Sequence, residues 1–154
     1  MSSSSLLRLI LSAFLMAAMA SLLPWQAVAQ TRSPAKRLPM TLRITIADTI
    51  LTARLEGGQA ARDFAAQLPL TLELSDYHQT EKIAQLPRKL DVRGEPDGYT
   101  PRTGDIAFYA PWGNIALFYK DFAYSKGLVR LGHISGDLDV LRQPGPYTAL
   151  IEQE

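Results

Sequence analysis

Cysteine is absent from the 154 residues of this chain. Its absence excludes disulfide bonds, thiolate nucleophiles, cysteine-ligated metal sites and lipid attachment to a leader cysteine. Stability must therefore come from an apolar core, and a domain of ordinary length can bury one without a covalent cross-link.

An excess of charge of either sign is also missing. The chain carries 16 lysine and arginine residues against 15 aspartate and glutamate residues, and the two signs are interspersed. Proteins that bind nucleic acids or anionic membrane surfaces usually present a field of one sign, because that field displaces counterions. We therefore expect neither partner for this domain.

Motifs of catalysis and cofactor binding are absent as well. The sequence has no glycine-rich phosphate loop between a strand and a helix, no Gly-x-Ser-x-Gly motif and no order of serine, histidine and aspartate that suggests a triad. Its two histidines, His78 and His133, are far apart. The sequence predicts no catalytic residues, no cofactor and no bound metal ion.

Long apolar runs are confined to the N-terminus. One cation, Arg8, precedes the stretch Leu9–Leu23, and the small residues Ala27 and Ala29 follow it, an order typical of a secretory signal peptide. As a helix the stretch would measure about 22 Å against a hydrocarbon core of roughly 30 Å, which favours a cleaved leader over a retained anchor. We expect cleavage of residues 1–29 after Ala29 and export to the periplasm or medium, with membrane contact only during export.

Residues 30–39 form the next segment. They are basic and contain Pro34 and Pro39, which favours a flexible tether. Residues 40–154 then change to short apolar alternations over the length of one ordinary domain.

The pattern from residue 40 onward predicts mainly strands. Apolar and polar residues alternate in Thr41–Ala47, and β-branched residues continue in Thr49–Leu55, so a hairpin is expected to turn at Ala47 and Asp48. Further strands are expected in residues 69–77, 89–92, 127–134 and 146–154. Helical segments are expected in residues 57–69 and 79–87, with a short helix or turn in residues 136–145. About eight strands and one or two short helices indicate a closed β-barrel or sandwich.

The segment GDIAFYAPWGNIALFYKDF, residues 104–122, is the richest in apolar and aromatic side chains. Two strand-length pieces flank the sequence PWGN, in which Pro111 and Gly113 supply the fixed and the positive φ that a tight connection needs. The segment predicts a hairpin with Ile106 and Phe108 on one face.

Three potential metal ligands, Asp76, His78 and Glu81, fall within six residues. A single imidazole is few for a metal site, which usually takes four protein ligands when it is structural. The same residues fit a polar junction between a strand and a helical turn, with Thr80 as the cap and Glu81 in the first turn. The second interpretation is favoured.

Trp112 has no fixed place in the strand alternation, because it lies in the turn of the predicted hairpin. Its side chain must fold back over the barrel end or remain exposed. Folded back, it would frame a small pocket at the barrel mouth, where tyrosines bury area and keep a polar tip. The candidate ligand-binding residues are Tyr77, His78, Glu81, Trp112, Tyr119 and Asp121.

Two longer runs carry a family resemblance. They are SDYHQTEKIAQLPRKLD (residues 75–91) and GEPDGYTPRTGDIAFYAPWGNIALFYKDFAYSKGLVRLGHI (residues 94–134). With their flanks, from about residue 40 to 152, they resemble the bacterial cyclophilin-like fold family. The resemblance implies a cyclophilin-type barrel of eight strands with short helices and no established activity. The Phe-His-Arg element of cyclophilin isomerases has no match, because His78 precedes a glutamine and His133 an isoleucine.

Two functions follow as hypotheses. The first is an exported, non-catalytic domain that binds a small molecule or an extended peptide at the barrel mouth. The alternative is a peptidyl-prolyl isomerase or chaperone-like enzyme in which Arg88, Arg93 or Arg102 replaces the missing arginine.

Overall fold

The structure is a computed structural model that describes residues 39–154. The predicted signal peptide, its cleavage site and all but the last residue of the predicted tether lie outside these residues. Within them the elements are β1 (Thr41–Ile46), β2 (Thr49–Leu55), α1 (Gln59–Ala65), β3 (Leu70–Tyr77), β4 (Glu81–Gln85), β5 (Gly98–Tyr99), β6 (Asp105–Tyr109), β7 (Asn114–Phe118), β8 (Ser125–Lys126), β9 (Leu128–Ser135), α2 (Asp139–Arg142) and β10 (Tyr147–Gln153). None of the helices in this part of the chain has the length and apolarity of a membrane span.

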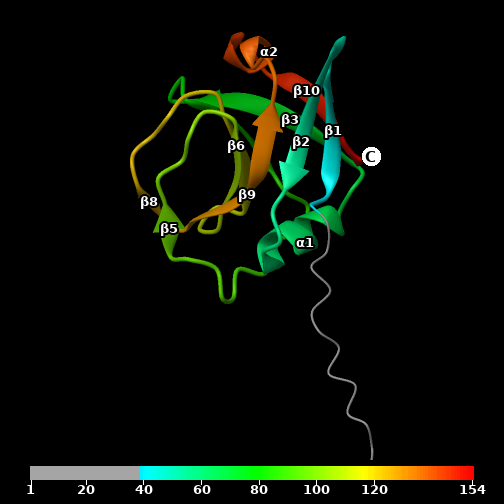
Figure 1. The fold of residues 1–154 in the computed structure, drawn as a ribbon. Coiled ribbons are helices and arrows are strands. Elements are labelled where there is room, and N and C mark those ends of the chain that lie inside the picture. Colours follow the sequence, from blue (N-terminus) through cyan, green and yellow to red (C-terminus); the bar gives the residue numbers. More distant parts are fainter. Residues whose placement is uncertain (1–38) are drawn as a thin grey trace, which may run out of the picture. The chain divides into compact units, whose positions relative to one another are not determined.

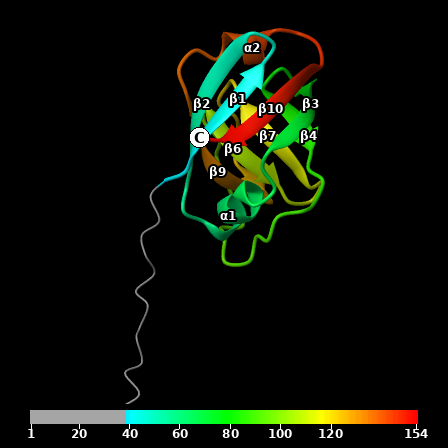
Figure 2. The same ribbon diagram turned by 90° about the vertical axis from the view of Figure 1, so that its right-hand side faces the viewer.

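Eight of the strands close into an antiparallel barrel. The order around it is β1, β10, β3, β4, β7, β6, β9 and β2, and β2 pairs again with β1. The short strands β5 and β8 pair with each other beside the barrel, at the left of Figure 1. Helices α1 and α2 lie at opposite ends of the barrel in both views (Figure 1, Figure 2). The predicted mainly β fold, a closed barrel of eight strands with two short helices, is confirmed.

The barrel interior is filled by alternate residues of its strands. On β1, Leu42, Ile44 and Ile46 are fully buried whereas Arg43 is exposed, as the period of two predicts. Phe64 of α1 and Leu141 of α2 join the same core. Each large apolar side chain buried in this way stabilises the fold by about 1.5–3 kcal/mol. The core thus stabilises the fold without any disulfide bond.

The predicted hairpin in residues 104–122 is confirmed. Strands β6 and β7 pair with Tyr109 opposite Asn114, and the Gly113 amide donates to the Tyr109 carbonyl at 2.8 Å. Gly113 has a φ of +77°, which a residue with a side chain adopts only at a cost. Ile106 and Phe108 both lie in the barrel core, on one face of β6.

Strand β7 is buried on both faces. Ile115 and Leu117 point into the barrel, while Ala116 and Phe118 belong to a second, smaller apolar cluster on its outer face. Residues 119–127, which we call the covering segment, follow β7 and carry side chains back over this outer face. The barrel therefore has an apolar surface outside as well as inside.

The helical turn predicted in residues 79–87 is wrong, because strand β4 occupies this segment. His78 and Gln79 have φ values of 50° and 54° at the centre of a tight turn, in which the Thr80 amide donates to the Tyr77 carbonyl at 3.1 Å. The Thr80 hydroxyl donates to the His78 carbonyl at 3.1 Å and caps no helix. Neither His78 nor Gln79 is a usual residue for two consecutive positive φ values, so local sequence preferences do not predict this turn.

The strand predicted in residues 89–92 is also wrong. The carboxylate of Asp63 on α1 accepts the Asp91 amide at 2.9 Å and the Arg88 guanidinium at 2.9 Å. Leu90 is buried in the core between them. This segment is bonded to the helix instead of to the sheet, and its apolar residue packs without strand pairing.

Candidate functional site

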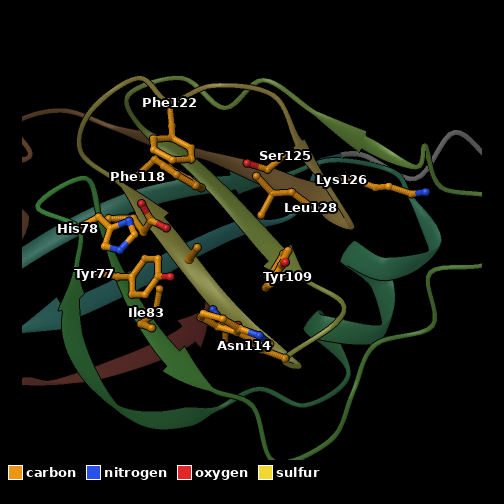
Figure 3. Close-up of a pocket in the computed structure, with 13 residues that line it drawn as sticks. Tyr77, His78, Ile83, Tyr109, Asn114, Phe118, Phe122, Ser125, Lys126 and Leu128 are labelled. Carbon is orange, nitrogen blue, oxygen red and sulfur yellow. The ribbon is translucent and has the colours of Figure 1, made fainter.

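A pocket of about 420 Å³ lies on the outer face of the barrel, beneath the covering segment (Figure 3). We call it the outer pocket. It is lined by Tyr77, His78, Glu81, Ile83, Tyr109, Trp112, Asn114, Ala116, Phe118, Phe122, Ser125, Lys126 and Leu128. Most of this lining is apolar or aromatic, with a few polar groups among the rings, as in many small-molecule sites.

The strand register sets the floor of the outer pocket. Cross-strand neighbours on this face form three rows: Tyr77, Glu81 and Phe118, then Ile83 and Ala116, then Asn114 and Tyr109. The middle row contains the methyl group of Ala116, while larger side chains stand in the rows on either side. A small residue between large ones leaves a hollow, since side chains stand roughly perpendicular to a sheet.

Aromatic rings form the walls of the outer pocket. Trp112 is 52% exposed, and its ring meets Tyr77 edge to face at 5.5 Å and Tyr109 at 5.3 Å between centroids. Tyr77 stacks on His78 at 4.1 Å. Phe122 lies at the rim beside Phe118 (Figure 3). These rings come from three separate parts of the chain, so the wall exists only in the folded protein.

Glu81 is the acidic group of the outer pocket. It is 9% exposed, and within residues 39–154 its carboxylate has no hydrogen bond or ion pair. Burial, together with the negative charge of Asp76, raises the pKa of Glu81 to about 7. The carboxyl group is therefore divided between its charged and neutral forms near neutral pH.

Lys82, the next residue, points to the opposite face of β4. It is fully buried, and its Nζ lies 3.1 Å from the Asp76 carboxylate and 2.8 Å from the Gln143 carbonyl. The Tyr119 hydroxyl donates to the same carboxylate at 2.5 Å. Burial acts to raise the pKa of Asp76, but the hydrogen bonds from Tyr119 and Lys82 outweigh it and hold this pKa below its usual value. This group is a satisfied structural network.

Asn114 adds a second acceptor to the outer pocket. The residue is 5% exposed, and its Nδ2 donates to the Ile115 carbonyl at 3.2 Å. Its Oδ1 is buried and has no partner in the described part of the chain. A buried acceptor without a donor is unfavourable, so this amide is a place where a ligand donor would be gained.

The structure brings together four of the six candidate residues. Tyr77, His78, Glu81 and Trp112 all line the outer pocket. Tyr119 instead packs in the core, and the exposed Asp121 accepts hydrogen bonds from Thr103 and Arg102. Neither Tyr119 nor Asp121 lines the outer pocket.

The position of the pocket also differs from the predicted one. We expected it at the barrel mouth, but its floor is the outer face of β4 and β7. The difference arises because Trp112 folds along the outside of the sheet, against Tyr77 and Tyr109, and not over the open end.

The three potential metal ligands are separated by the sheet. Asp76 faces the network around Lys82, whereas His78 and Glu81 line the outer pocket. Within residues 39–154 there is no group of three or more histidine, aspartate or glutamate side chains arranged to hold a metal ion. The spacing in the sequence therefore does not become a cluster in space.

The three arginines considered for an isomerase lie outside the outer pocket. Each is paired with a carboxylate: Arg88 with Asp63 at 2.9 Å, Arg93 with Asp91 at 2.6 Å and Arg102 with Asp121 at 3.0 Å. None of them lines the pocket, so the geometry gives no support to a substitute for the missing arginine.

Sequence reasoning missed most of the floor and the rim. The missed residues are Ile83, Tyr109, Asn114, Ala116, Phe118, Phe122, Ser125, Lys126 and Leu128. A signal was present in the continuous apolar runs of residues 106–109 and 115–118, which break strand alternation. Such runs are typical of strands that are covered on both faces. They indicate that something lies over the outside of the barrel there.

A second hollow adjoins the first. It has a volume of about 530 Å³ and shares Tyr109 and Lys126 with the outer pocket. Glu95, Asp97 and Pro111 are among its other lining residues. The two hollows are thus neighbours on one surface, separated by the side chains that they share.

Comparisons with known proteins agree with this architecture. The solution structure of the hypothetical protein AF2241 from Archaeoglobus fulgidus is similar, with a TM-score of 0.56 and 16% sequence identity over 75% of this chain and 95% of that one. At this identity the likeness concerns the fold. Curated proteins gave no match. A family model described as the Cyclophilin-like family matches residues 44–152, and the chain therefore belongs to the cyclophilin-like family.

Proposed function

We propose that this protein is a non-catalytic binding domain that takes a small organic molecule into the outer pocket. The pocket volume of about 420 Å³ falls within the range of small-molecule sites, roughly 300–1,000 Å³. Its apolar and aromatic lining would supply most of the affinity, and its few polar groups would fix the orientation of the ligand.

The observation that carries this proposal is the pair of buried acceptors without partners. Glu81 and Asn114 both line the outer pocket and are 9% and 5% exposed, and neither the Glu81 carboxyl group nor the Asn114 Oδ1 has a donor within residues 39–154. A purely structural surface is expected to satisfy such groups or replace them by apolar ones. A ligand that brings donors would satisfy them.

An extended peptide is a second candidate ligand, and the second hollow favours it. A chain lying across Tyr109 and Lys126 would reach both hollows, whereas a small molecule would occupy one. The two ligands differ in which substitutions weaken their binding. Changes at Pro111 would affect a peptide and leave a small molecule in the outer pocket unaffected.

Trp112 provides the test, because it is the single tryptophan of residues 39–154 and lies on the pocket wall. With Trp25 replaced by phenylalanine, the emission of Trp112 would be followed during titration with small organic molecules and short peptides. Ala116→Leu would fill the floor and should abolish binding. Ala123→Leu makes the same change at an exposed position and should not. If neither class of ligand shifts the emission, or if both variants bind equally well, the proposal is wrong.

We also propose that the domain is exported. The leader-like order of residues 1–29 supports this. N-terminal sequencing of periplasmic and secreted fractions should give a chain that starts at Gln30. A chain that keeps Met1 and sediments with membranes would show that the leader is an anchor.

A further inference from the structure

We propose that the ligand of the outer pocket is an organic ammonium ion with an apolar body, and that its binding displaces a proton from Glu81. The inference rests on the proposed binding function and names the chemical class that this site recognises. It is carried by the chemistry of the pocket lining.

Two acceptors of the outer pocket have no donor within residues 39–154. They are the carboxyl group of Glu81, a residue that is 9% exposed, and the fully buried Oδ1 of Asn114. An ammonium group brings N–H donors and a positive charge, so it would satisfy a carboxylate more strongly than a neutral donor does. An anionic ligand would place its charge against Glu81.

The rings favour the same ligand. The faces of tryptophan, tyrosine and phenylalanine carry negative electrostatic potential, which attracts cations within about 6 Å of a ring centre. Trp112 stands nearly perpendicular to both Tyr77 and Tyr109, at 89° and 84°, so the three rings enclose space from different directions. Phe118 and Phe122 extend this enclosure.

The lysine in the lining does not occupy the place of the cation. Lys126 contributes its stem, while its amino group points away from the rings at the outer edge of the site (Figure 3). The buried lysine, Lys82, is held on the other face of β4 by Asp76 and the Gln143 carbonyl. Glu81 therefore has no cation of the described chain against it.

Proton displacement follows from linkage. The carboxyl group of Glu81 holds a proton about half of the time near pH 7, and the ammonium ion binds the ionised form. Other titratable groups face it or lie just across the sheet; they are Asp76, Tyr77, His78, Lys82, Tyr109, Tyr119 and Lys126. Of these, Asp76 is the group whose charge helps to keep the proton on Glu81. Binding should strengthen about tenfold from pH 6 to pH 8, because the ionised fraction rises by about that factor.

The test compares three probes that share a phenyl ring and a short chain. They are 2-phenylethylamine, which is a cation, 2-phenylethanol, which is neutral, and 3-phenylpropionate, which is an anion. Titration calorimetry of the full chain should show the amine binding at least about tenfold more tightly than the alcohol at pH 8, with the propionate weakest. In buffers of different ionisation enthalpy, the amine should release about half a proton at pH 7 and the alcohol none.

Glu81→Gln keeps the shape of the side chain and removes the charge. In this variant the amine should bind no more tightly than 2-phenylethanol, and its affinity should no longer change between pH 6 and pH 8. The pH profile of the wild type does not depend on how well the variant folds. If all three probes bind the wild type equally, the proposed binding function is supported and the proposed ammonium ligand is wrong. If none binds at millimolar concentration, both proposals fail.

Discussion

Glu81 and Lys82 are neighbours on β4, yet the sheet separates them into opposite environments. Lys82 lies inside and is held by a carboxylate and a backbone carbonyl, whereas Glu81 lies outside with no partner in residues 39–154. Both side chains are buried. On the inner face of this sheet the polar group of Lys82 has its partners, whereas on the outer face, beneath the covering segment, Glu81 and Asn114 each have an acceptor without a donor in residues 39–154. Burial alone therefore does not distinguish a structural residue from a candidate binding residue, but the state of its hydrogen bonds does.

The largest expected effect on stability comes from a substitution in the barrel core. Phe108→Ala should lower the free energy of unfolding by about 3–5 kcal/mol, because it leaves a cavity in the barrel core where Phe108 is 1% exposed. Denaturant melts would measure this loss.

Trp112→Ala is the matched change on the outer face. It should lower stability by less than about 1.5 kcal/mol, because this side chain is half exposed in a turn, and it should weaken ligand binding. If Trp112→Ala unfolds the domain while Phe108→Ala does not, the tryptophan is part of the core. That result would contradict the assignment of stability to the inner face and of binding to the outer face.

Removing the charge of Lys82 should have the next largest effect. Lys82→Met keeps the length of the side chain, but it leaves the Gln143 carbonyl without this donor and the Asp76 carboxylate without its cation, with only the hydrogen bond from Tyr119 kept. This loss should cost about 2–3 kcal/mol. Lys120→Met makes the same change at an exposed site and should stay within about 0.5 kcal/mol. Equal melting curves for the two variants would contradict the structural role of Lys82.

Glu81→Gln should act in the opposite direction and should depend on pH. The folded pKa of about 7 lies above the ordinary value of 4.5, so the stabilising contribution of protonated Glu81 is complete below pH 4.5 and is lost as the pH rises through 7. The variant should be more stable than the wild type by about 1–2 kcal/mol at pH 8, after allowance for solvent screening, and should differ little at pH 4.5. Thermal melts at the two pH values measure the difference, and a variant that is less stable at pH 8 would show that Glu81 has a stabilising partner.

The smallest effect is expected at the turn beside the pocket. Gln79 is exposed and has a φ of 54°, so Gln79→Gly should raise the free energy of unfolding by about 0.5–1 kcal/mol by removing a strained Cβ. Gln79→Ala keeps the Cβ and should bring no gain. Denaturant melts in which both variants gain equally would show that backbone strain is not the cause.

The fold was predictable from the sequence where polar and apolar side chains alternate. The site was not, because it lies on strands that lack this alternation. In β1 and β3 one face is polar, so the period of two marks the strand. In β6 and β7 both faces are apolar, and the sequence predicts strands without saying what covers them. The covering comes from residues that are adjacent only after the barrel has closed. Tyr77, His78 and Glu81 reached the candidate set because their polarity stood out, while Ala116 was missed because a small residue gives no local signal of a hollow.

The turn at His78 and Gln79 illustrates a second limit. A strand was read as a helical turn because threonine and glutamate at residues 80 and 81 fit a helix start as well as they fit a strand after a tight turn. Local propensity could not separate the two, and pairing with β3 and β7 decided between them. The helical prediction put Glu81 in the first turn of a helix, whereas the structure places it on β4, at the floor of the outer pocket.

The covering segment is hydrogen-bonded to the loop at residues 97–101, which should affect how fast the outer pocket opens. Its Phe122 and Gly127 amides donate to the carbonyls of Pro101 and Asp97, and its strand β8 pairs with β5. Gly98 makes that pairing close, because a Cβ there would collide with the Ser125 carbonyl. Three further backbone bonds join the covering segment to the turns of the barrel: the Tyr119 and Lys120 amides donate to the Thr80 carbonyl, and the Ala110 amide donates to the Gly127 carbonyl. Because the paired strands β5 and β8 lie outside the barrel ladder, their amides should exchange with solvent faster than those of β6 and β7. The time that a ligand spends bound would then be governed by the opening of this small unit, while the barrel beneath it stays closed.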